Sequence, residues 1–200
     1  MGANYLSSPL ALIITTLFDL YILLVLLRFL LQMFRADFYN QISQFIVKAT
    51  TPALKLFRKF IPGFAGQDIA AIVLCLVLIY LKFILLRLVD IPVVSIGNAV
   101  APIGAVGYGA LIVFSIADLV SLTLTVFLIA IIIQVVLSWI SPGSYNPIIG
   151  LINTIASPVM NPIRRILPSM GGLDLSPLFA SLAIMVIKML LIPPIIYLAR

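Results

Sequence analysis

The sequence contains no histidine and only one cysteine among its 200 residues. The lack of histidine removes the commonest general base and the commonest metal and haem ligand of proteins. The single cysteine, Cys75, excludes an intrachain disulfide, and its place inside an apolar run predicts a buried, inert thiol. The sequence also lacks a phosphate-binding loop and a nucleophile elbow. We therefore expect no catalytic residues, no metal and no cofactor, and we expect that the protein is not an enzyme.

Charged residues are scarce as well. They make up 9% of the chain, whereas 64% is hydrophobic and the mean hydropathy is +1.29. Soluble domains carry roughly a quarter charged residues, and a soluble fold of this composition would expose apolar surface to water. The composition thus predicts a protein of the lipid bilayer. In a membrane protein, a net charge of +6 points to the orientation of the chain and to contact with anionic lipids. We expect no nucleic-acid partner, because no basic stretch is interleaved with aromatic residues.

Four apolar runs are long enough to cross the hydrocarbon core, which takes about 20 residues. The predicted spans are residues 10–34, 69–89, 111–140 and 175–198. The N-terminus lacks the basic region of a secretory signal, so we expect the first run to be kept as a span. Residues 90–109, rich in glycine and proline, are expected to connect two halves. The predicted fold is an all-α membrane protein with four transmembrane helices.

The two halves repeat one pattern at a separation of 106 residues. Between Tyr39–Lys82 and Tyr145–Lys188, 11 of 44 positions are identical without a gap. The matched pairs include Asn40 and Asn146, Pro52 and Pro158, Arg58 and Arg164, Pro62 and Pro168, Gly66 and Gly172, Asp68 and Asp174, and Lys82 and Lys188. Each half contributes two spans, so the repeats at 1–100 and 101–200 are predicted to be parallel rather than inverted.

Each half carries a basic, amphipathic segment between its two spans. Apolar residues recur at three- and four-residue steps from Ile42 to Phe60, which is typical of an amphipathic helix in the membrane interface. Pro52 and Pro62 in the first segment, and the prolines of the second, among them Pro158, are expected to break these segments into short helical pieces. The candidate surface for a lipid or a partner consists of the cations at their ends, Arg58, Lys59, Arg164 and Arg165. Attraction to anionic lipid is the simpler interpretation of these cations.

The distribution of cations also predicts which way the chain faces. Loops 35–68 and 141–174 carry most of the lysine and arginine residues, which places them in the cytoplasm and both termini outside. Asp68 and Asp174 directly precede a span, so each is expected to cap the N-terminus of that helix.

The charged side chains expected within the membrane are Asp19, Arg28, Lys82 and Lys188. Asp19 and the two lysines lie about 21–22 Å from the loop end of their spans, at ~1.5 Å per residue, so Asp19 can pair with either lysine. A structural ion pair or snorkelling lysines are favoured over an ion or proton route, which needs several groups. Arg28 is expected to snorkel to lipid phosphate. Asp118 is expected in turns that project beyond the bilayer.

The best-preserved loop pattern lies in the second half, at Asn146-Pro147, Pro158, Arg164, Pro168, Gly171-Gly172, Asp174 and Ser176-Pro177. At these residues the chain resembles the YggT family of small bacterial integral membrane proteins, which also has plastid relatives. The resemblance covers nearly the whole chain and is to the two-copy form. The first half departs from it at Gln41, which replaces the proline after asparagine, and at Ala71, which replaces Pro177.

The resemblance implies a bacterial inner-membrane protein with links to osmotic-stress tolerance, while plastid relatives are linked to cytochrome assembly and Gram-positive relatives to cell division. We therefore expect a non-enzymatic accessory protein that supports osmotic-stress tolerance through lipid or protein contacts. A small ion channel or transporter, and an assembly factor for cytochrome or division machinery, are the alternatives. The expected partners are anionic lipids, another membrane protein or a second copy of the chain.

Overall fold

The computed structural model describes residues 3–61, 63, 66–140, 146–166 and 174–199. Its elements in chain order are α1 (Ala3–Met33), α2 (Gln41–Phe57), α3 (Ile69–Leu88), β1 (Val94–Ile96), β2 (Ala99–Ala101), α4 (Tyr108–Ile140), α5 (Pro147–Ile166) and α6 (Ser176–Leu198). The segments long and apolar enough to cross a membrane are Ser7–Met33, Ile69–Leu88, Tyr108–Ile140 and Ser176–Leu198. The four predicted spans are therefore confirmed.

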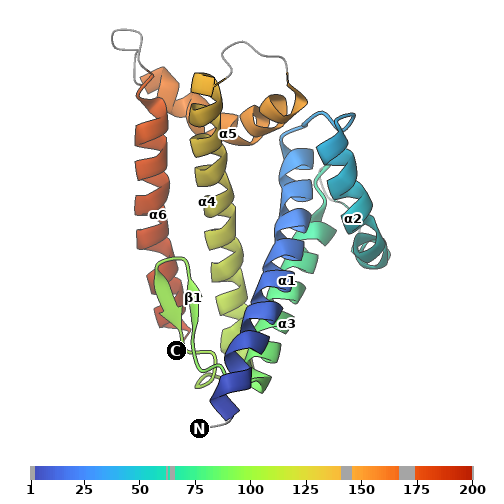
Figure 1. Ribbon diagram of the computed structural model, residues 1–200, viewed down its shortest axis with the longest axis vertical. Coiled ribbons are helices and arrows are strands. Elements are labelled where there is room, and N and C mark those ends of the chain that lie inside the picture. The colour runs from blue at the N-terminus through green and yellow to red at the C-terminus, as the bar shows by residue number, and fades with distance from the viewer. Residues whose placement is uncertain (1–2, 62, 64–65, 141–145, 167–173, 200) are drawn as a thin grey trace.

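The spanning helices form two antiparallel pairs, and the two pairs have the same orientation. In Figure 1, α1 and α4 run in one direction and α3 and α6 in the other, so both chain ends lie at one end of the molecule. Helix α1 packs on α3, α4 packs on α6, and α3 contacts α4 to join the halves. Helix α5 lies across the opposite end, and α2 packs along α1 and α3 (Figure 1). This end, called the loop end below, carries α5 and the start of α2, and α2 then runs down beside α1 to about mid-height (Figure 1).

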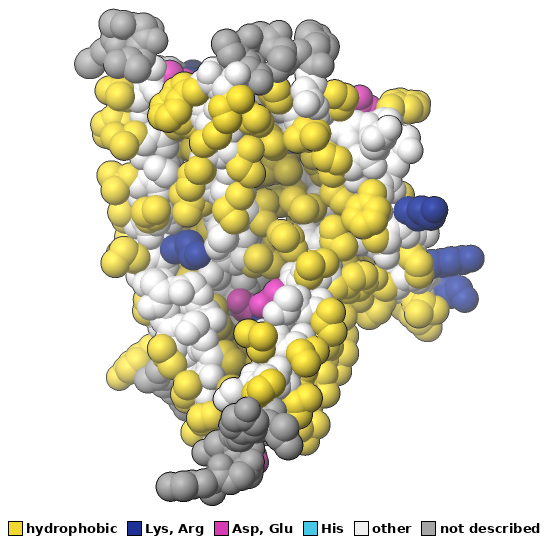
Figure 2. Space-filling view, viewed as in Figure 1, with side chains coloured by type: hydrophobic (Ala, Val, Ile, Leu, Met, Phe, Trp, Pro, Cys, Tyr) yellow, Lys and Arg dark blue, Asp and Glu magenta, His cyan; other side chains and the backbone are white. Residues whose placement is uncertain are grey.

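Apolar side chains occupy both the centre and the outside of the molecule. Phe83 and Phe114 are fully buried between the helices, whereas Leu17, Met189 and Leu190 are 66%, 63% and 67% exposed. Figure 2 shows hydrophobic side chains over most of one face. This surface is what a bilayer-embedded protein presents to lipid, because the surrounding acyl chains are as apolar as the side chains.

The prolines do not break the amphipathic helices, so that expectation is wrong. Helix α2 continues through Pro52, and α5 continues through Pro158 and Pro162. A proline in a helix leaves the carbonyl four residues earlier without its N–H donor. For Pro158 that carbonyl belongs to Thr154, and the hydroxyl of Ser157 donates to it at 3.1 Å. Side-chain hydroxyls are known to satisfy such freed carbonyls in membrane helices. Four further members of the predicted motif, Pro62, Pro168, Gly171 and Gly172, lie outside the described residues.

The connector between the halves contains a β-hairpin that the sequence analysis did not predict. Strands β1 and β2 pair antiparallel, with Ile96 opposite Ala99 across the two-residue turn Gly97-Asn98. Gly97 has a φ of +60°, which a side chain would strain, and a Cβ there would lie 2.7 Å from Ser121 Oγ. Ile96 and Ala101 are fully buried, and the hairpin contacts α4 and α6. The connector is thus folded against the second helix pair.

Candidate functional site

The first polar cluster is an ionic triad inside the spanning region. Lys82 Nζ on α3 donates to Asp19 Oδ1 on α1 at 2.6 Å and to Asp118 Oδ2 on α4 at 2.8 Å. The Lys82 side chain is only 7% exposed, while that of Asp19 is 54% exposed. Of the two pairings left open by the sequence, the structure has Asp19 with Lys82. Asp118 was missed as a partner, because the sequence analysis placed it beyond the level of Lys82, whereas the two side chains are in contact.

Lys188, which matches Lys82 in the second repeat, has a neutral partner. Lys188 Nζ donates to Thr125 Oγ1 at 2.7 Å, and Thr125 stands 106 residues after Asp19. The same lysine position therefore has a carboxylate in the first repeat and a hydroxyl in the second. The charges of Asp19, Lys82, Asp118 and Lys188 sum to zero, which lowers the cost of holding them within the membrane.

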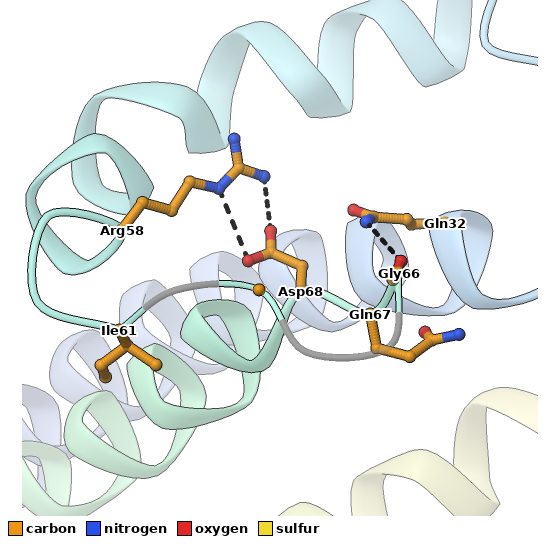
Figure 3. Close-up of a pocket in the computed structure, with 7 residues that line it drawn as sticks. Gln32, Arg58, Ile61, Gly66, Gln67 and Asp68 are labelled. Atoms are coloured by element: carbon orange, nitrogen blue, oxygen red, sulfur yellow. Dashed lines mark hydrogen bonds and ion pairs between the residues drawn. The ribbon is translucent and has the colours of Figure 1, made fainter.

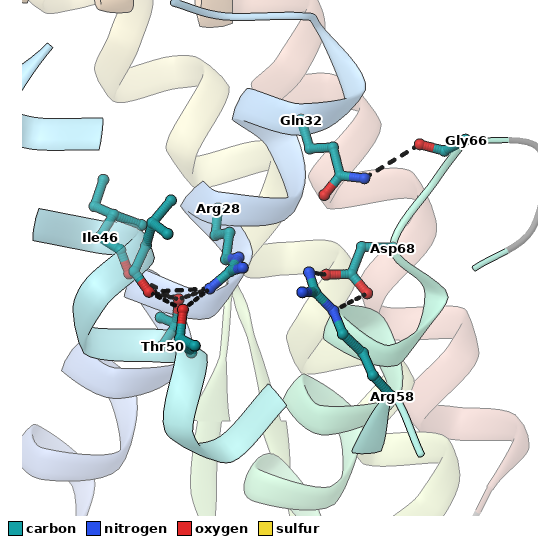
Figure 4. Close-up of polar contacts among 9 residues, drawn as sticks. Arg28, Gln32, Ile46, Thr50, Arg58, Gly66 and Asp68 are labelled. Carbon is teal, nitrogen blue, oxygen red and sulfur yellow. Dashed lines mark hydrogen bonds and ion pairs between the residues drawn. The ribbon is translucent and has the colours of Figure 1, made fainter. Parts of the chain in front are cut away.

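Arg28 does not snorkel to lipid, contrary to the expectation. Its guanidinium donates to the Val47 carbonyl at 3.0 Å and to the hydroxyls of Thr50 and Thr51, each at 2.9 Å. Figure 4 shows Arg28 pointing from α1 towards α2 at Thr50. Because α2 packs along α1, these acceptors replace lipid phosphate, and Arg28 is only 7% exposed. Its counterpart Gln134 has a buried Oε1 without a hydrogen-bond partner among the described residues.

An arginine–aspartate pair closes the interspan segment in each repeat. Arg58 Nη2 lies 2.5 Å from Asp68 Oδ2, and Arg164 Nε lies 2.9 Å from Asp174 Oδ2. Asp68 is buried, whereas Asp174 is exposed on its loop. Neither pair was predicted, although both partners stand at matched positions of the repeat. The pairing is therefore a conserved feature of the duplication within this chain.

The two aspartates also differ in how they meet the next helix. Asp68 stands at the N-cap of α3, but its side chain makes no capping hydrogen bond, so that expectation is wrong. Its carboxylate instead accepts hydrogen bonds from the guanidinium of Arg58 (Figures 3 and 4). Asp174 Oδ1 accepts from the backbone N–H of Ser176 at 2.9 Å. Burial would raise the pKa of the Asp174 carboxyl, but hydrogen bonds from Ser176 and Arg164 hold it below its usual range.

The asparagine that the two loops share, Asn40 in the first repeat, accepts hydrogen bonds at the start of the helix that follows it. Its Oδ1 accepts from the backbone N–H groups of Ile42 and Ser43 at 2.7 and 3.1 Å and so caps α2. Its Nδ2 donates to the carbonyl of Pro147 at 3.3 Å, which joins the starts of α2 and α5. Asn146 accepts from Ile148 N in the matching way at 2.9 Å.

Of the cations proposed from the sequence as an interaction surface, Arg58 and Lys59 lie at the C-terminal end of α2. Thr51, Lys55, Arg58 and Lys59 line a shallow pocket of about 280 Å³. Arg58 also borders a pocket of about 460 Å³, drawn in Figure 3, whose lining includes Gln32, Gln67 and Asp68. We call the residues Thr51, Lys55, Arg58 and Lys59 the basic ridge. The equivalent positions on α5 are Ser157, Asn161, Arg164 and Arg165, so the second repeat keeps two of the three cations.

This architecture defines a multi-pass membrane protein made of two parallel copies of one helix–loop–helix unit. The family model CCB3/YggT matches residues 7–89 and again residues 113–195, which begin and end 106 residues later. The chain therefore belongs to the CCB3/YggT family, as the loop pattern predicted.

Several bacterial proteins are similar over most of their length. A Pseudomonas aeruginosa protein is 46% identical over 186 residues, covering 90% of this chain and 86% of its own. A Vibrio alginolyticus protein is 39% identical over 170 residues, covering 84% and 85%. The Escherichia coli K12 protein YggT is 32% identical over 184 residues, covering 91% and 88%. The names of all three describe them as uncharacterised. No solved structure matches the chain.

Proposed function

We propose that the protein is a non-enzymatic accessory protein of the bacterial inner membrane that works by holding anionic lipid at the basic ridge. The osmotic-stress role is suggested by the family resemblance, and the lipid contact by the chemistry of α2. The observation that carries the proposal is that three cations, Lys55, Arg58 and Lys59, gather at the C-terminal end of α2 beside exposed apolar side chains. Leu56 is 60% exposed and Phe60 is 85% exposed. An amphipathic helix with this composition is typical of the lipid interface.

The charge balance of the ridge favours an anionic headgroup. Asp68 neutralises Arg58, which leaves the ammonium groups of Lys55 and Lys59 without an ion pair among the described residues. Both lysines are exposed, so a lipid phosphate can approach them without displacing a protein group. Each cation near an anionic bilayer surface contributes about 1 kcal/mol.

A hydroxyl-bearing headgroup would find an acceptor in the adjoining pocket. Gln67 Oε1 is buried there and has no hydrogen-bond partner among the described residues. A buried acceptor without a donor costs free energy that a ligand or a water can recover. Phosphatidylglycerol carries both a phosphate and hydroxyl groups, so it suits the ridge and the pocket together.

The lipid contact leads to a direct prediction. Changing both Lys55 and Lys59 to Gln should weaken retention of phosphatidylglycerol roughly 30-fold, because two contributions of about 1 kcal/mol are lost. Native mass spectrometry of the protein released from nanodiscs, with phosphatidylglycerol and phosphatidylcholine in equal amounts, measures this retention. Growth of a deletion strain at high osmolarity, complemented by the same variant, checks the physiological part.

A matched variant separates a site from general surface attraction. Changing Arg35 and Lys48 to Gln removes two exposed cations from the same interspan segment but leaves the ridge intact. This control should lose far less phosphatidylglycerol. An equal loss in both variants would contradict a site at the ridge.

The proposal places the interspan segments in the cytoplasm and both termini outside, as the excess of cations on the segments supports. A reporter active only in the cytoplasm should be active when it is fused after Lys59 and inactive when it is fused to the N-terminus. The reverse pattern would overturn this orientation.

An ion route is the second candidate, because Asp118 adds a second carboxylate to the charges inside the spans. The contact of Lys82 with both aspartates favours a structural role, since each charge already has its partner. Ion flux in liposomes that is lost with Asp19→Asn would favour the route instead.

A further inference from the structure

A pocket between the end of α1 and the first half of α2 contains a buried cation. Its volume is about 420 Å³, within the range of roughly 300–1,000 Å³ that is usual for ligand sites. Arg28 stands five residues before Met33, the end of α1, which is about 8 Å along the helix. The pocket therefore lies towards the loop end, within reach of lipid headgroups and water. Its lining residues are Arg28, Gln32, Phe38, Gln44, Val47 and Lys48.

The protein uses only part of the Arg28 guanidinium. Nη1 makes the three hydrogen bonds to α2, and all three acceptors are neutral oxygens. Nε and Nη2 have no hydrogen-bond partner among the described residues. Neither is a fully buried atom, so both reach the open space that Arg28 lines. Two N–H-bearing nitrogens of a side chain that is only 7% exposed are thus left for a ligand.

No carboxylate of the described residues balances this buried charge, because Arg28 makes no ion pair with any of them. The pair Arg58–Asp68 acts on Arg28 with opposite signs, and the repulsion from Arg58 is the stronger. Asp37, in the loop between α1 and α2, accepts from a backbone N–H and does not line the pocket. Lys48 adds a second cation that forms no ion pair with a described residue. The lining therefore carries two positive charges and no negative one.

We infer that this pocket binds a dianionic phosphate group, carried by a lipid phosphomonoester or by a soluble phosphate. Such a group has roughly two negative charges at pH 7 and three acceptor oxygens, which match the two cations. The fork of Arg28 suits two oxygens of one phosphate, and Lys48 supplies a point charge. Gln32 and Gln44 each use one amide N–H within the protein and keep a second for the ligand.

This site is distinct from the basic ridge, because no residue of the ridge lines it. A phosphodiester such as phosphatidylglycerol carries a single charge, so it matches only one of the two cations in the pocket. The second repeat has no equivalent, since Gln134 and Thr154 stand at the positions of Arg28 and Lys48. We therefore expect one phosphate group per chain.

Two probes test the site and separate its sources. The protein carries Lys55→Gln and Lys59→Gln, so that the proposed ridge cannot supply the signal, and is kept in neutral detergent without phosphate. Inorganic phosphate and dioctanoyl phosphatidic acid are titrated separately, and dioctanoyl phosphatidylglycerol is the phosphodiester comparison. Calorimetry gives the affinity and the number bound. Binding of inorganic phosphate supports the site with a soluble source, and binding of phosphatidic acid alone supports it with a lipid source.

Lys48→Gln is the decisive variant, because Lys48 is exposed and makes no hydrogen bond or ion pair with a described residue on which folding could depend. We expect it to weaken binding roughly tenfold, the size of one charge-assisted hydrogen bond. Arg28→Gln, which copies Gln134, should weaken binding at least as much. Arg35→Gln removes an exposed cation that does not line the pocket, and it should change the affinity by less than about twofold.

Three results would overturn the inference. The first is that neither phosphate nor phosphatidic acid binds. The second is that phosphatidylglycerol binds as tightly as phosphatidic acid, since the pocket would then not select a dianion. The third is that Arg35→Gln weakens binding as much as Lys48→Gln, which would show general attraction to a basic surface. Failure of the basic ridge leaves all three results unchanged, because the ridge lysines are already absent.

Discussion

Replacing Lys82 with methionine is expected to lower the free energy of unfolding by about 3–5 kcal/mol, because the carboxylate of Asp118, only 19% exposed, is left without a counter-charge. The ammonium group joins α1, α3 and α4, so its loss leaves Asp19 and Asp118 facing each other without a counter-charge. The contact between α3 and α4 also joins the two repeats. Unfolding by SDS titration in mixed micelles measures the change.

The duplication supplies the control for this variant. Lys188→Met removes the same side chain from the matched position, where the partner is the Thr125 hydroxyl. We expect a loss of about 1 kcal/mol, the usual size of a polar contact between membrane helices. Adding Asp118→Asn to Lys82→Met should recover part of the stability, since it removes one of the unpaired charges. Equal losses for the two lysines would show that the triad does not stabilise the fold.

The spans and their parallel order could be predicted because both depend on chain length and hydrophobicity alone. An apolar run of about 20 residues must cross the hydrocarbon core, and its direction follows from the number of crossings. The depth of Asp19 and Lys82 could likewise be counted along each helix. The identity of their neighbours could not, because it depends on how the helices rotate and pack against one another. Asp118 was missed for this reason.

Arg28 also shows that the partners of a side chain within a span could not be predicted from the sequence. Its distance from the end of the span indicated lipid phosphate as its partner, which is the usual destination of such a side chain. The structure instead gives it the Val47 carbonyl and two threonine hydroxyls of α2. Only the packing of α2 along α1 brings these acceptors within reach. Sequence separation gives no sign of that contact.

The hairpin could have been found from its turn. Gly97-Asn98 between Val94-Ser95-Ile96 and Ala99-Val100-Ala101 is a two-residue turn signal between short β-prone runs. The prolines and glycines around it made the whole segment resemble an irregular connector. Three-residue strands give too few alternations to outweigh that composition.

The two repeats have diverged in charge while they kept the same order of helices. Asp19, Arg28 and Lys55 in the first repeat correspond to Thr125, Gln134 and Asn161 in the second, three neutral residues. The first repeat therefore holds two of the three members of the ionic triad, the buried arginine and the fuller basic ridge. The second repeat holds Asp118 and the lysine without a carboxylate, and the hairpin between the two repeats packs on its helices α4 and α6.

Replacing Arg58 with methionine is expected to lower the free energy of unfolding by about 2–3 kcal/mol, because it leaves the buried carboxylate of Asp68 without its partner. Asp68 is only 4% exposed and receives no capping hydrogen bond from α3. The estimate is below that for a fully buried pair because the Arg58 side chain is 43% exposed and therefore partly screened by solvent. The same SDS titration measures the loss.

Arg164→Met makes the same change in the second repeat and differs mainly in the burial of the aspartate. Asp174 is 44% exposed, so water can solvate its carboxylate after the arginine is gone, and the loss should stay below about 1 kcal/mol. Adding Asp68→Asn to Arg58→Met should restore most of the stability, because asparagine removes the buried charge and is itself a good N-cap residue. If Arg58→Met and Arg164→Met were equally destabilising, burial of the carboxylate could not be the cause. If the double variant stayed as unstable as Arg58→Met, the loss would instead come from the packing of the arginine stem.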